Sequence, residues 1–561
     1  MDPILKLALQ TLEQNKQAII FTPSRISAEK TAEDISKLTA FFLPELEKEI
    51  LKAAGTPTRQ CRKLSHVIKK GIAFHHAGLL QKQKELIEDE FRTGKIKIIC
   101  ATPTLAAGLS LPVFRVVIKS LKRYSGQWGM DWIPVLEYLQ MAGRAGRPEY
   151  EAFGEAICIA KDQAEKEEIY ERYICGKPEA IYSKLAVEPV LRTYLLSLIS
   201  SGIIRDQHSM KEFFKETFWA YQFKDLHKLE SIMQKMLRLL EGWRFITIAG
   251  TTKGDFVSAN ELKAGMNDEK LRATSIGKRI SELYLDPLTA QHLLECLANF
   301  ERNNLTTASS EVPKTNKNPH RPNGQGIFNV ENTNKSGHKF ADPTTASSGV
   351  SPTNKNTFSL LQMISHTLEM RPLLKIKSRE QDFIQEELNA RHNLLLEEEP
   401  GIDDIDYDDF ISSIKTALFF ESWTEEHDED FLLEKFDIRP GEIRVKQETA
   451  DWLLYAAEEL AALQDRKTAV KEIRKLRLRV RYGVKEELLA LIKLKGIGGV
   501  RTRKLYAHGI RDLGDVKKAD ITTLSQLLGK AVAESIQKQL GEDIKEVPKG
   551  TRKGQTSILK Y

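Results

Sequence analysis

The sequence predicts a multidomain protein in which an α/β domain with a parallel sheet is followed by helical and smaller mixed domains. Three observations support this fold class. The chain has 561 residues, which is room for about three to five domains of roughly 150 residues each. Short apolar runs alternate with helical patterns as far as residue 176, which is typical of a parallel sheet with crossover helices. From Lys177 onward the alternation ends and helical patterns predominate.

Five buried strands are expected in the first domain, residues 1–176. Each is an apolar run that leads into small polar residues or a helical pattern. The runs are residues 18–25, 71–76, 97–101, 113–119 and 155–160. Ligands of parallel sheets bind beyond the carboxyl ends of the strands. The polar residues at those ends form the candidate site: Ser24, Arg25, Thr102 and residues 140–147.

Composition limits the class of protein. The hydrophobic share of 41% is ordinary for a globular chain, and a net charge of +6 is too small to indicate nucleic-acid binding by itself. No two cysteines form a Cys-x-x-Cys pair and no Cys/His group has zinc-site spacing, so we expect reduced, buried thiols and no metal site. Without a signal peptide or a bilayer-length apolar run, a soluble, cytoplasmic protein is favoured.

The strongest motif is the run Gln-Met-Ala-Gly-Arg-Ala-Gly-Arg at residues 140–147. Alone, it is compatible with an ordinary basic helix start. Its functional interpretation is supported by two other segments, residues 101–112 at the end of a strand and Phe-His-His-Ala-Gly at residues 74–78. Together the three segments resemble motif VI, motif V and the intervening histidine motif of Ski2-like helicases of superfamily 2, which implies a second RecA-like domain.

The resemblance implies roles for individual residues. Arg144 and Arg147 match the catalytic arginines that stabilise charge on a transferring phosphate, and their spacing puts both on one helical face. Gln140, Gly108 and Gly143 match the nucleotide cleft. Ser24, Arg25 and Thr102 match positions that contact the DNA backbone. Ser110 stands where the family more usually has Asn, so a side-chain role there is not carried over.

Residues 116–134 read as two strands joined by a turn, because Ser125-Gly126 and Gly129 interrupt them. Similar helicases place a strand-separating β-hairpin here, and an aromatic side chain near its tip can wedge into the last base pair. Trp128 and Tyr124 are the candidates. The alternative is an ordinary hairpin with surface aromatics.

The ATP-binding front half of such a helicase has no counterpart in the sequence. No Gly-x-x-x-x-Gly-Lys-Ser/Thr loop is present, and no Asp-Glu-x-His or Asp-Glu-x-Asp run follows a buried strand. We therefore expect ATP and Mg²⁺ to be bound mainly by an N-terminal RecA-like half. That half would come from another chain or from a gene start placed too late, and this chain alone should not hydrolyse ATP.

Residues 177–268 resemble a winged helix, because three helical stretches precede a β-hairpin expected at 245–249 and 255–258. In similar proteins this module mainly packs against the motor. Residues 269–480 resemble a helical ratchet domain, interrupted by a polar, disordered insertion at 303–356 that holds an internal repeat. Residues 395–430 are acidic and are expected to form a solvated face.

A long helix near residues 443–463 has a buried stripe of Ala450, Leu453, Ala457 and Leu460. Trp452 projects off that stripe, and in similar helicases a tryptophan on this helix stacks on a base of the translocating strand. The alternative is a tryptophan packed inside the protein. A basic cluster follows and is expected to track phosphates; it comprises Arg466, Lys467, Lys471, Arg474, Lys475, Arg477, Arg479 and Arg481.

Residues 481–545 resemble a helix–hairpin–helix domain. Gly496 and Gly498 would bare backbone amides toward a DNA phosphate, and Arg501 adds charge. A weaker second copy is expected near residues 524–531. The flexible tail, residues 546–561, contains Gln555, Ile558 and Tyr561, whose spacing resembles a peptide that docks on a sliding clamp.

The order of these segments resembles the archaeal Ski2-like DNA helicases of Hjm type, relatives of the helicase portion of polymerase theta. The resemblance implies ATP-driven 3′-to-5′ translocation on single-stranded DNA and unwinding of branched or stalled forks in repair. Two alternatives stay open. One is a fragment of a Ski2-like RNA helicase, although those generally lack a terminal helix–hairpin–helix. The other is a non-catalytic DNA-binding protein derived from a helicase.

Overall fold

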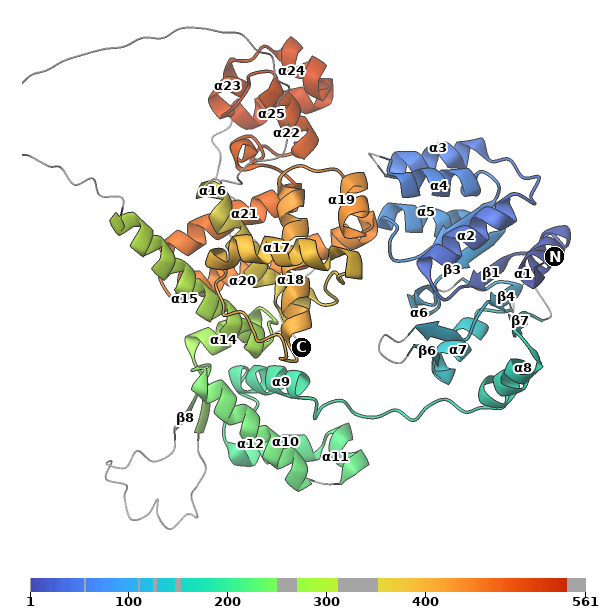
Figure 1. Cartoon of the computed structure of the whole chain (residues 1–561), viewed down its shortest axis with the longest axis horizontal. Coiled ribbons are helices and arrows are strands. Elements are labelled where there is room, and N and C mark those ends of the chain that lie inside the picture. The colour runs from blue at the N-terminus through green and yellow to red at the C-terminus, as the bar shows by residue number, and fades with distance from the viewer. Residues whose placement is uncertain are drawn as a thin grey trace, which may run out of the picture.

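A computed structural model of the chain describes residues 2–54, 57–108, 111–124, 129–146, 153–224, 226–249, 270–310 and 352–541. Figure 1 shows an α/β domain, drawn blue to teal, beside a larger helical body. A small bundle of helices, drawn red, lies at one end of that body. No helix among the described residues is long and apolar enough to cross a bilayer.

The α/β domain contains a five-stranded sheet with strand order β2-β3-β1-β4-β7 and all pairs parallel. The strands are β1 (Ala18–Phe21), β2 (Ile72–His75), β3 (Ile98–Ala101), β4 (Arg115–Ile118) and β7 (Glu155–Cys158). All five predicted strands are confirmed. The first four are buried at every residue, as continuous apolar runs require in a sheet covered on both faces.

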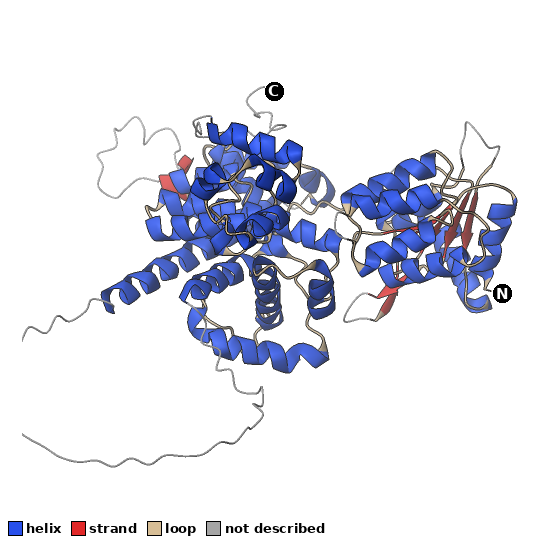
Figure 2. Ribbon diagram, turned by 90° about the horizontal axis from the view of Figure 1, so that it is seen from above, coloured by secondary structure: helices blue, strands red, loops and turns tan. Residues whose placement is uncertain are grey.

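Helices lie on both sides of this sheet (Figure 2). They are α1 (Pro3–Glu13), α2 (Arg25–Ser36), α3 (Pro44–Ala53), α4 (Arg59–Ile68), α5 (Gln81–Arg92), α6 (Thr104–Gly108), α7 (Val135–Ala142) and α8 (Gln163–Ile169). In the sheet register Phe21 pairs with Ala101, and Ala101 pairs with His75. The polar residues that follow β1, β2 and β3 therefore meet at one edge of the sheet.

The predicted hairpin strands are present. Strands β5 (Lys122–Tyr124) and β6 (Met130–Trp132) pair antiparallel, with Tyr124 opposite Met130. Lys122 Nζ lies 4.0 Å from the centre of the Trp132 ring, and Arg123 forms an ion pair with Glu137 of α7 at 2.9 Å. These contacts fix the base of the hairpin to the α/β domain. Trp128, the candidate wedge, lies outside the described residues.

The next module has four helices and a two-stranded sheet. They are α9 (Glu188–Ser200), α10 (Gln207–Lys215), α11 (Phe218–Phe223), α12 (Leu226–Gly242), β8 (Ile246–Ala249) and β9 (Lys270–Ala273). The strand that pairs with β8 is β9, whereas the strand predicted at 255–258 lies outside the described residues. The module shares one hydrophobic core with the helical body, and the buried Arg192 bonds Asp286 at 2.7 Å. Among the described residues the module therefore packs against the helical body, and its packing against the motor stays a prediction.

The helical body consists of α14 (Ser275–Glu282), α15 (Pro287–Ser310), α16 (Pro352–Ser365), α17 (Gln381–Arg391), α18 (Tyr407–Thr424), α19 (Glu429–Phe436), α20 (Pro440–Leu463) and α21 (Lys467–Tyr482). Helices α15 and α16 extend into both ends of the insertion predicted at 303–356. Extending an existing helix is cheap because each added residue gains a hydrogen bond without a new nucleation cost. The polar composition at the two ends of the predicted insertion gave no indication that the helices continue into it.

The C-terminal bundle has its own small core, which includes Leu491, Leu505, Leu524 and Ile536. Its elements are η5 (Glu486–Leu488), α22 (Gly499–Ala507), α23 (Leu513–Lys518), α24 (Ile521–Leu528) and α25 (Lys530–Gly541). The proposed clamp residues Gln555, Ile558 and Tyr561 lie outside the described residues. Of the cysteines, Cys61, Cys100 and Cys296 are buried as predicted, whereas Cys175 is exposed.

Candidate functional site

The motif VI segment begins on helix α7 but leaves it before its first arginine. Gly143 is the C-cap of α7, and Gly146 has a φ of +98°, a conformation that favours glycine. The Arg144 carbonyl accepts from Val113 N at 2.9 Å, and Gly146 N donates to the Val113 carbonyl at 2.7 Å. The prediction that Arg144 and Arg147 share a helical face was therefore wrong, because the glycines end the helix and turn the chain onto the segment before β4.

Helix α7 is held from outside its own sequence. Its N-cap, Pro134, makes no side-chain cap, and the carboxylate of Glu179 accepts instead from Val135 N at 2.6 Å and Leu136 N at 3.1 Å. These backbone N–H groups, Val135 first, lower the pKa of Glu179. The linker after the α/β domain thus fixes the helix that carries motif VI.

The guanidinium of Arg144 links motif VI to motif V. Its Nη2 donates to the carbonyl of Ala106, on the short helix α6. Its Nε is buried and has no hydrogen-bond partner among the described residues. A buried, unpaired donor on a charged group is costly unless a ligand completes it. Arg144 is therefore held in place by Ala106 while other donors of its guanidinium, the buried Nε among them, have no partner that the structure describes.

The other residues predicted to bind nucleotide lie in the same two segments, motif V and motif VI. Gln140 is exposed on α7, Gly143 is exposed at its end, and Gly108 ends α6. Arg147 lies outside the described residues. The described residues of the predicted nucleotide site are therefore one positioned arginine, the exposed side chain of Gln140, and the glycines at the ends of α6 and α7.

The two histidines of the intervening motif are buried and act on the protein itself. His76 Nδ1 accepts from Gly78 N at 3.1 Å, which leaves Nε2 to donate to Glu29 at 3.3 Å. Burial lowers the pKa of His76, so the neutral ring required by this arrangement is favoured. His75 contacts Glu88 at 3.0 Å. The histidine pair therefore shapes the loop at Ala77 and Gly78.

That loop is where the α/β domain meets helix α20 of the helical body. Gly441 N donates to the Gly78 carbonyl at 3.1 Å, and Arg439 Nε lies 3.8 Å from a Glu29 carboxylate oxygen. Arg25 pairs with Glu442 in the first turn of α20. Arg25, predicted to contact DNA, thus has a carboxylate partner across the junction. Its DNA role stays a prediction.

Ser24 and Thr102 lie at the same sheet edge as Arg25. Ser24 is exposed and caps α2, because its Oγ accepts from Ser27 N at 3.2 Å. Thr102 Oγ1 lies 2.9 Å from Thr104 Oγ1, and Thr102 N donates to the His75 carbonyl at 3.3 Å. The structure therefore brings together the three residues predicted to face DNA.

Helix α20 carries the predicted stripe, and Ala450, Leu453, Ala457 and Leu460 are all buried. Trp452 is half-buried against the same core, and its Nε1 donates to the Leu283 carbonyl at 3.1 Å. One edge of the indole is thus fixed to the protein, in line with the packing alternative. Stacking of Trp452 on a base stays a prediction.

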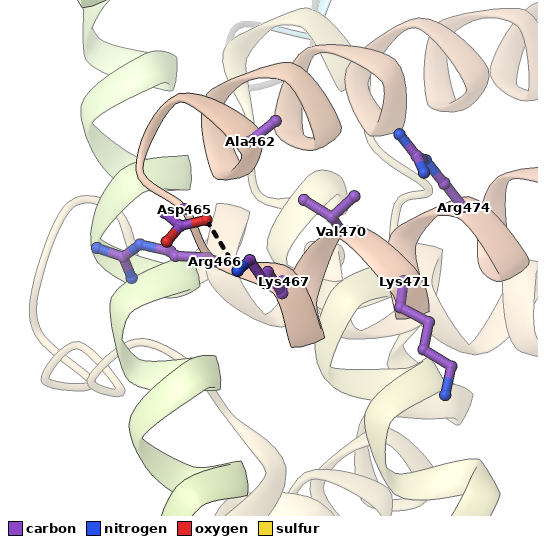
Figure 3. Close-up of a pocket in the computed structure, with 7 residues that line it drawn as sticks. All are labelled: Ala462, Asp465, Arg466, Lys467, Val470, Lys471 and Arg474. Atoms are coloured by element: carbon purple, nitrogen blue, oxygen red, sulfur yellow. Dashed lines mark ion pairs between the residues drawn. The ribbon is translucent and has the colours of Figure 1, made fainter.

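The basic cluster lies on and around helix α21. Its first part lines a surface pocket of about 490 Å³, shown in Figure 3 with Arg466, Lys467, Lys471 and Arg474 as sticks. Farther along, Arg477 pairs with Asp451 at 2.8 Å, and the buried Arg479 pairs with Glu425 at 3.0 Å. The expectation that the whole cluster faces phosphates is therefore too broad, because Arg477 and Arg479 serve the fold.

The C-terminal bundle presents the expected helix–hairpin–helix turn. Gly498 is the N-cap of α22, and Gly496 has a φ of +86°. A Cβ added at either glycine would meet no atom within 4 Å, so the backbone there is open to a ligand. Arg501 is exposed and donates to the Gly496 carbonyl at 3.1 Å. The second copy is also present, with Gly529 joining α24 to α25.

Gly498→Ala is expected to weaken DNA binding without destabilising the chain. The φ of Gly498 is −97° and its Cβ would meet nothing, but a methyl group at the start of α22 would obstruct an approaching phosphate. Loss of one such contact, about 1 kcal/mol, raises Kd about fivefold in fluorescence anisotropy with forked DNA at fixed salt. Gly242→Ala, which also meets open space, is the control. An unchanged Kd would contradict this role.

Taken together, the parallel-sheet domain with its motif V–VI turn and the helix–hairpin–helix bundle define the C-terminal portion of a superfamily 2 helicase. Residues 2–149 match the helicase conserved C-terminal domain, residues 358–483 match domain 4 of archaeal helicases, and residues 488–542 match a SAM-like helix–hairpin–helix tandem. The resemblance to the C-terminal portion of an archaeal Ski2-like helicase with a helix–hairpin–helix domain is thereby confirmed.

Relatives that match along nearly the whole chain identify one family within this class. The chain is 33% identical to the ATP-dependent DNA helicase Hel308 of Methanocella arvoryzae, over all of this chain and 68% of that protein. It is also 33% identical to Hel308 of Pyrococcus horikoshii, over 98% of this chain and 67% of that protein. The chain belongs to the Hel308 family of archaeal helicases, and it spans about two thirds of the length of these relatives.

Proposed function

We propose that this chain is the DNA-binding and motor-completing half of an ATP-dependent 3′-to-5′ DNA helicase that acts on branched or stalled forks in repair. The observation that carries the proposal is Arg144, held by the Ala106 carbonyl with a buried Nε that no described residue satisfies. An arginine retained in this geometry fits a nucleotide phosphate. A P-loop and a Mg²⁺-holding carboxylate, which these 561 residues lack, would come from an N-terminal RecA-like half.

Residues of this chain would complete the nucleotide site from one side. Arg144 would offer the guanidinium donors that do not bond Ala106 to a phosphate oxygen, while Gln140 and Gly143 would line the exposed approach. Bound ATP with Mg²⁺ supplies the free energy of hydrolysis. The Arg144–Ala106 link would pass a shift at the phosphate to motif V, which follows β3 at the edge carrying Thr102.

Two surfaces would bind DNA without specificity for its base sequence. One is the open turn at Gly496 and Gly498, and the other is the exposed part of the basic cluster on α21. Both relatives are named as DNA helicases, which supports DNA over RNA as the substrate of this chain.

Reconstitution tests the proposal directly. The neighbouring reading frame is searched for an N-terminal RecA-like half with a P-loop and a DExH box, and that half is co-expressed with this chain. We expect forked DNA to stimulate ATP hydrolysis by the mixture and not by either half alone. Hydrolysis by this chain alone, or DNA binding without any ATPase in the mixture, would reject the split-motor assignment; the second outcome would favour a non-catalytic DNA-binding protein.

A further inference from the structure

A cluster of two histidines and one carboxylate lies in the helical body. His292 belongs to α15, His366 follows the last residue of α16, and Glu397 lies shortly after the 3₁₀ turn η4 (His392–Leu394). One ligand atom from each side chain lies within 4.8 Å of the other two. Three segments that are distant in sequence therefore present metal-binding groups to one point.

The geometry of the cluster is tight and sheltered. His366 Nδ1 lies 2.9 Å from both carboxylate oxygens of Glu397, and His292 Nδ1 lies 3.4 Å from one of them. The three side chains are 16–20% exposed. Zn²⁺ bonds of about 2.0–2.2 Å in a tetrahedron place ligand atoms about 3.3 Å apart, which is close to these separations.

The hydrogen bond made by one ring nitrogen of His292 leaves its other nitrogen facing Glu397. His292 Nε2 lies 3.0 Å from the Met363 carbonyl, which only accepts, so the ring proton is on Nε2. In the neutral ring the Nδ1 lone pair then faces the Glu397 carboxylate, and both groups are acceptors. A second proton or a metal ion is needed to make that contact favourable.

From this arrangement we propose that His292, His366 and Glu397 bind one divalent transition-metal ion, with Zn²⁺ the best match. Two nitrogens and one carboxylate oxygen are ligands that Zn²⁺ accepts, with a fourth position left for water. The Met363 carbonyl holds the far nitrogen of His292, as second-shell carbonyls commonly do for metal-bound histidines. Cys296 Sγ lies 3.8 Å from both nitrogens of His292, hence against the ring rather than in line with its lone pair.

The ion would join the two helices that flank residues 311–351 to the segment that carries Glu397. That segment is already tied to α15, because Asn299 Nδ2 donates to the Leu396 carbonyl at 2.9 Å. Closing long loops between ligands stabilises a fold through the entropy that the unfolded chain loses. The site would thus be structural, fastening the first turns of α15 to the C-terminal end of α16.

The cluster was missed in the sequence for two physical reasons. The ligands are separated by whole helices, so no short Cys/His spacing exists. Glu397 also lies in the acidic stretch expected to form a solvated face, but its side chain is only 16% exposed. For Glu397 that expectation was wrong.

The test uses the whole chain, without an affinity tag, treated with a chelator and then titrated with Zn²⁺ or Co²⁺. We expect one ion per chain after dialysis, a higher Tm, and a Co²⁺ visible spectrum of a four-coordinate nitrogen–oxygen site. His366→Gln and Glu397→Gln should each weaken binding at least about 10²-fold. His392→Gln removes an exposed histidine that contacts Glu399 at 3.5 Å, and should bind like the wild type.

Two results would overturn the site. One is a folded wild-type chain that retains no ion, which would leave the cluster as a hydrogen-bonded acid–base group. The other is binding by both ligand variants as tight as that of the wild type, which would place the ion elsewhere. If the variants fail to fold, X-ray absorption of the wild-type chain with Zn²⁺ decides, because a ligand set other than two imidazoles with oxygen excludes the proposal.

Discussion

Arg144→Ala is expected to lower the DNA-stimulated ATPase rate of the assembled helicase by at least about 10³-fold, the lower range for loss of an arginine finger. The side chain is positioned by its bond to the Ala106 carbonyl and keeps a buried Nε without a partner. Removing it deletes the charge that would stabilise a leaving phosphate. The rate is measured in the reconstituted enzyme at saturating forked DNA, and the Kd for DNA is measured alongside it.

Two controls separate catalysis from structure in this experiment. Arg92→Ala removes an exposed arginine whose partner is Asp89 at 2.6 Å, and should leave ATPase unchanged. Arg144→Lys retains a positive charge but not the planar fork of donors, so it should remain deeply impaired. If DNA affinity or Tm of Arg144→Ala falls in step with ATPase, the residue acts by holding motifs V and VI together.

The sheet and its candidate site were predictable because their signals are local. Most residues of each strand are apolar, and parallel pairing then places Ser24, Arg25 and Thr102 at one edge without further information. The motif VI turn was only half predicted. The spacing of Arg144 and Arg147 suggests a helical face, but Gly143 and Gly146 end the helix first.

Contacts between distant segments could not be predicted. Strand β8 pairs with residues 270–273, where no strand was predicted, since pairing is decided by tertiary packing as well as by strand propensity. The Arg25–Glu442 pair joins residues 417 positions apart, and no single-sequence pattern marks it. The helix near residues 443–463 was predicted, but not what the first turn of that helix contacts.

The contact between Gly441 and Gly78 makes the junction sensitive to a single methyl group. A Cβ at residue 441 would lie 2.4 Å from the carbonyl oxygens of both Ala77 and Leu79. These are backbone atoms beside the buried histidine motif, so they cannot move aside as a flexible side chain would. The clash must be relieved by separating α20 from the α/β domain.

Gly441→Ala is therefore expected to uncouple unwinding from ATP hydrolysis. A backbone clash of this kind costs about 1–3 kcal/mol, which lowers the population of the closed junction about 5- to 150-fold. In the assembled enzyme, strand separation per ATP hydrolysed should fall about tenfold or more, while Arg144 and its surroundings keep ATPase active. Gly242→Ala, where a Cβ meets nothing within 4 Å, should retain wild-type coupling. Equal losses of unwinding and ATPase in Gly441→Ala would instead show that the junction is needed to build the nucleotide site, and normal unwinding would show that α20 does not transmit the motion of the motor through this contact.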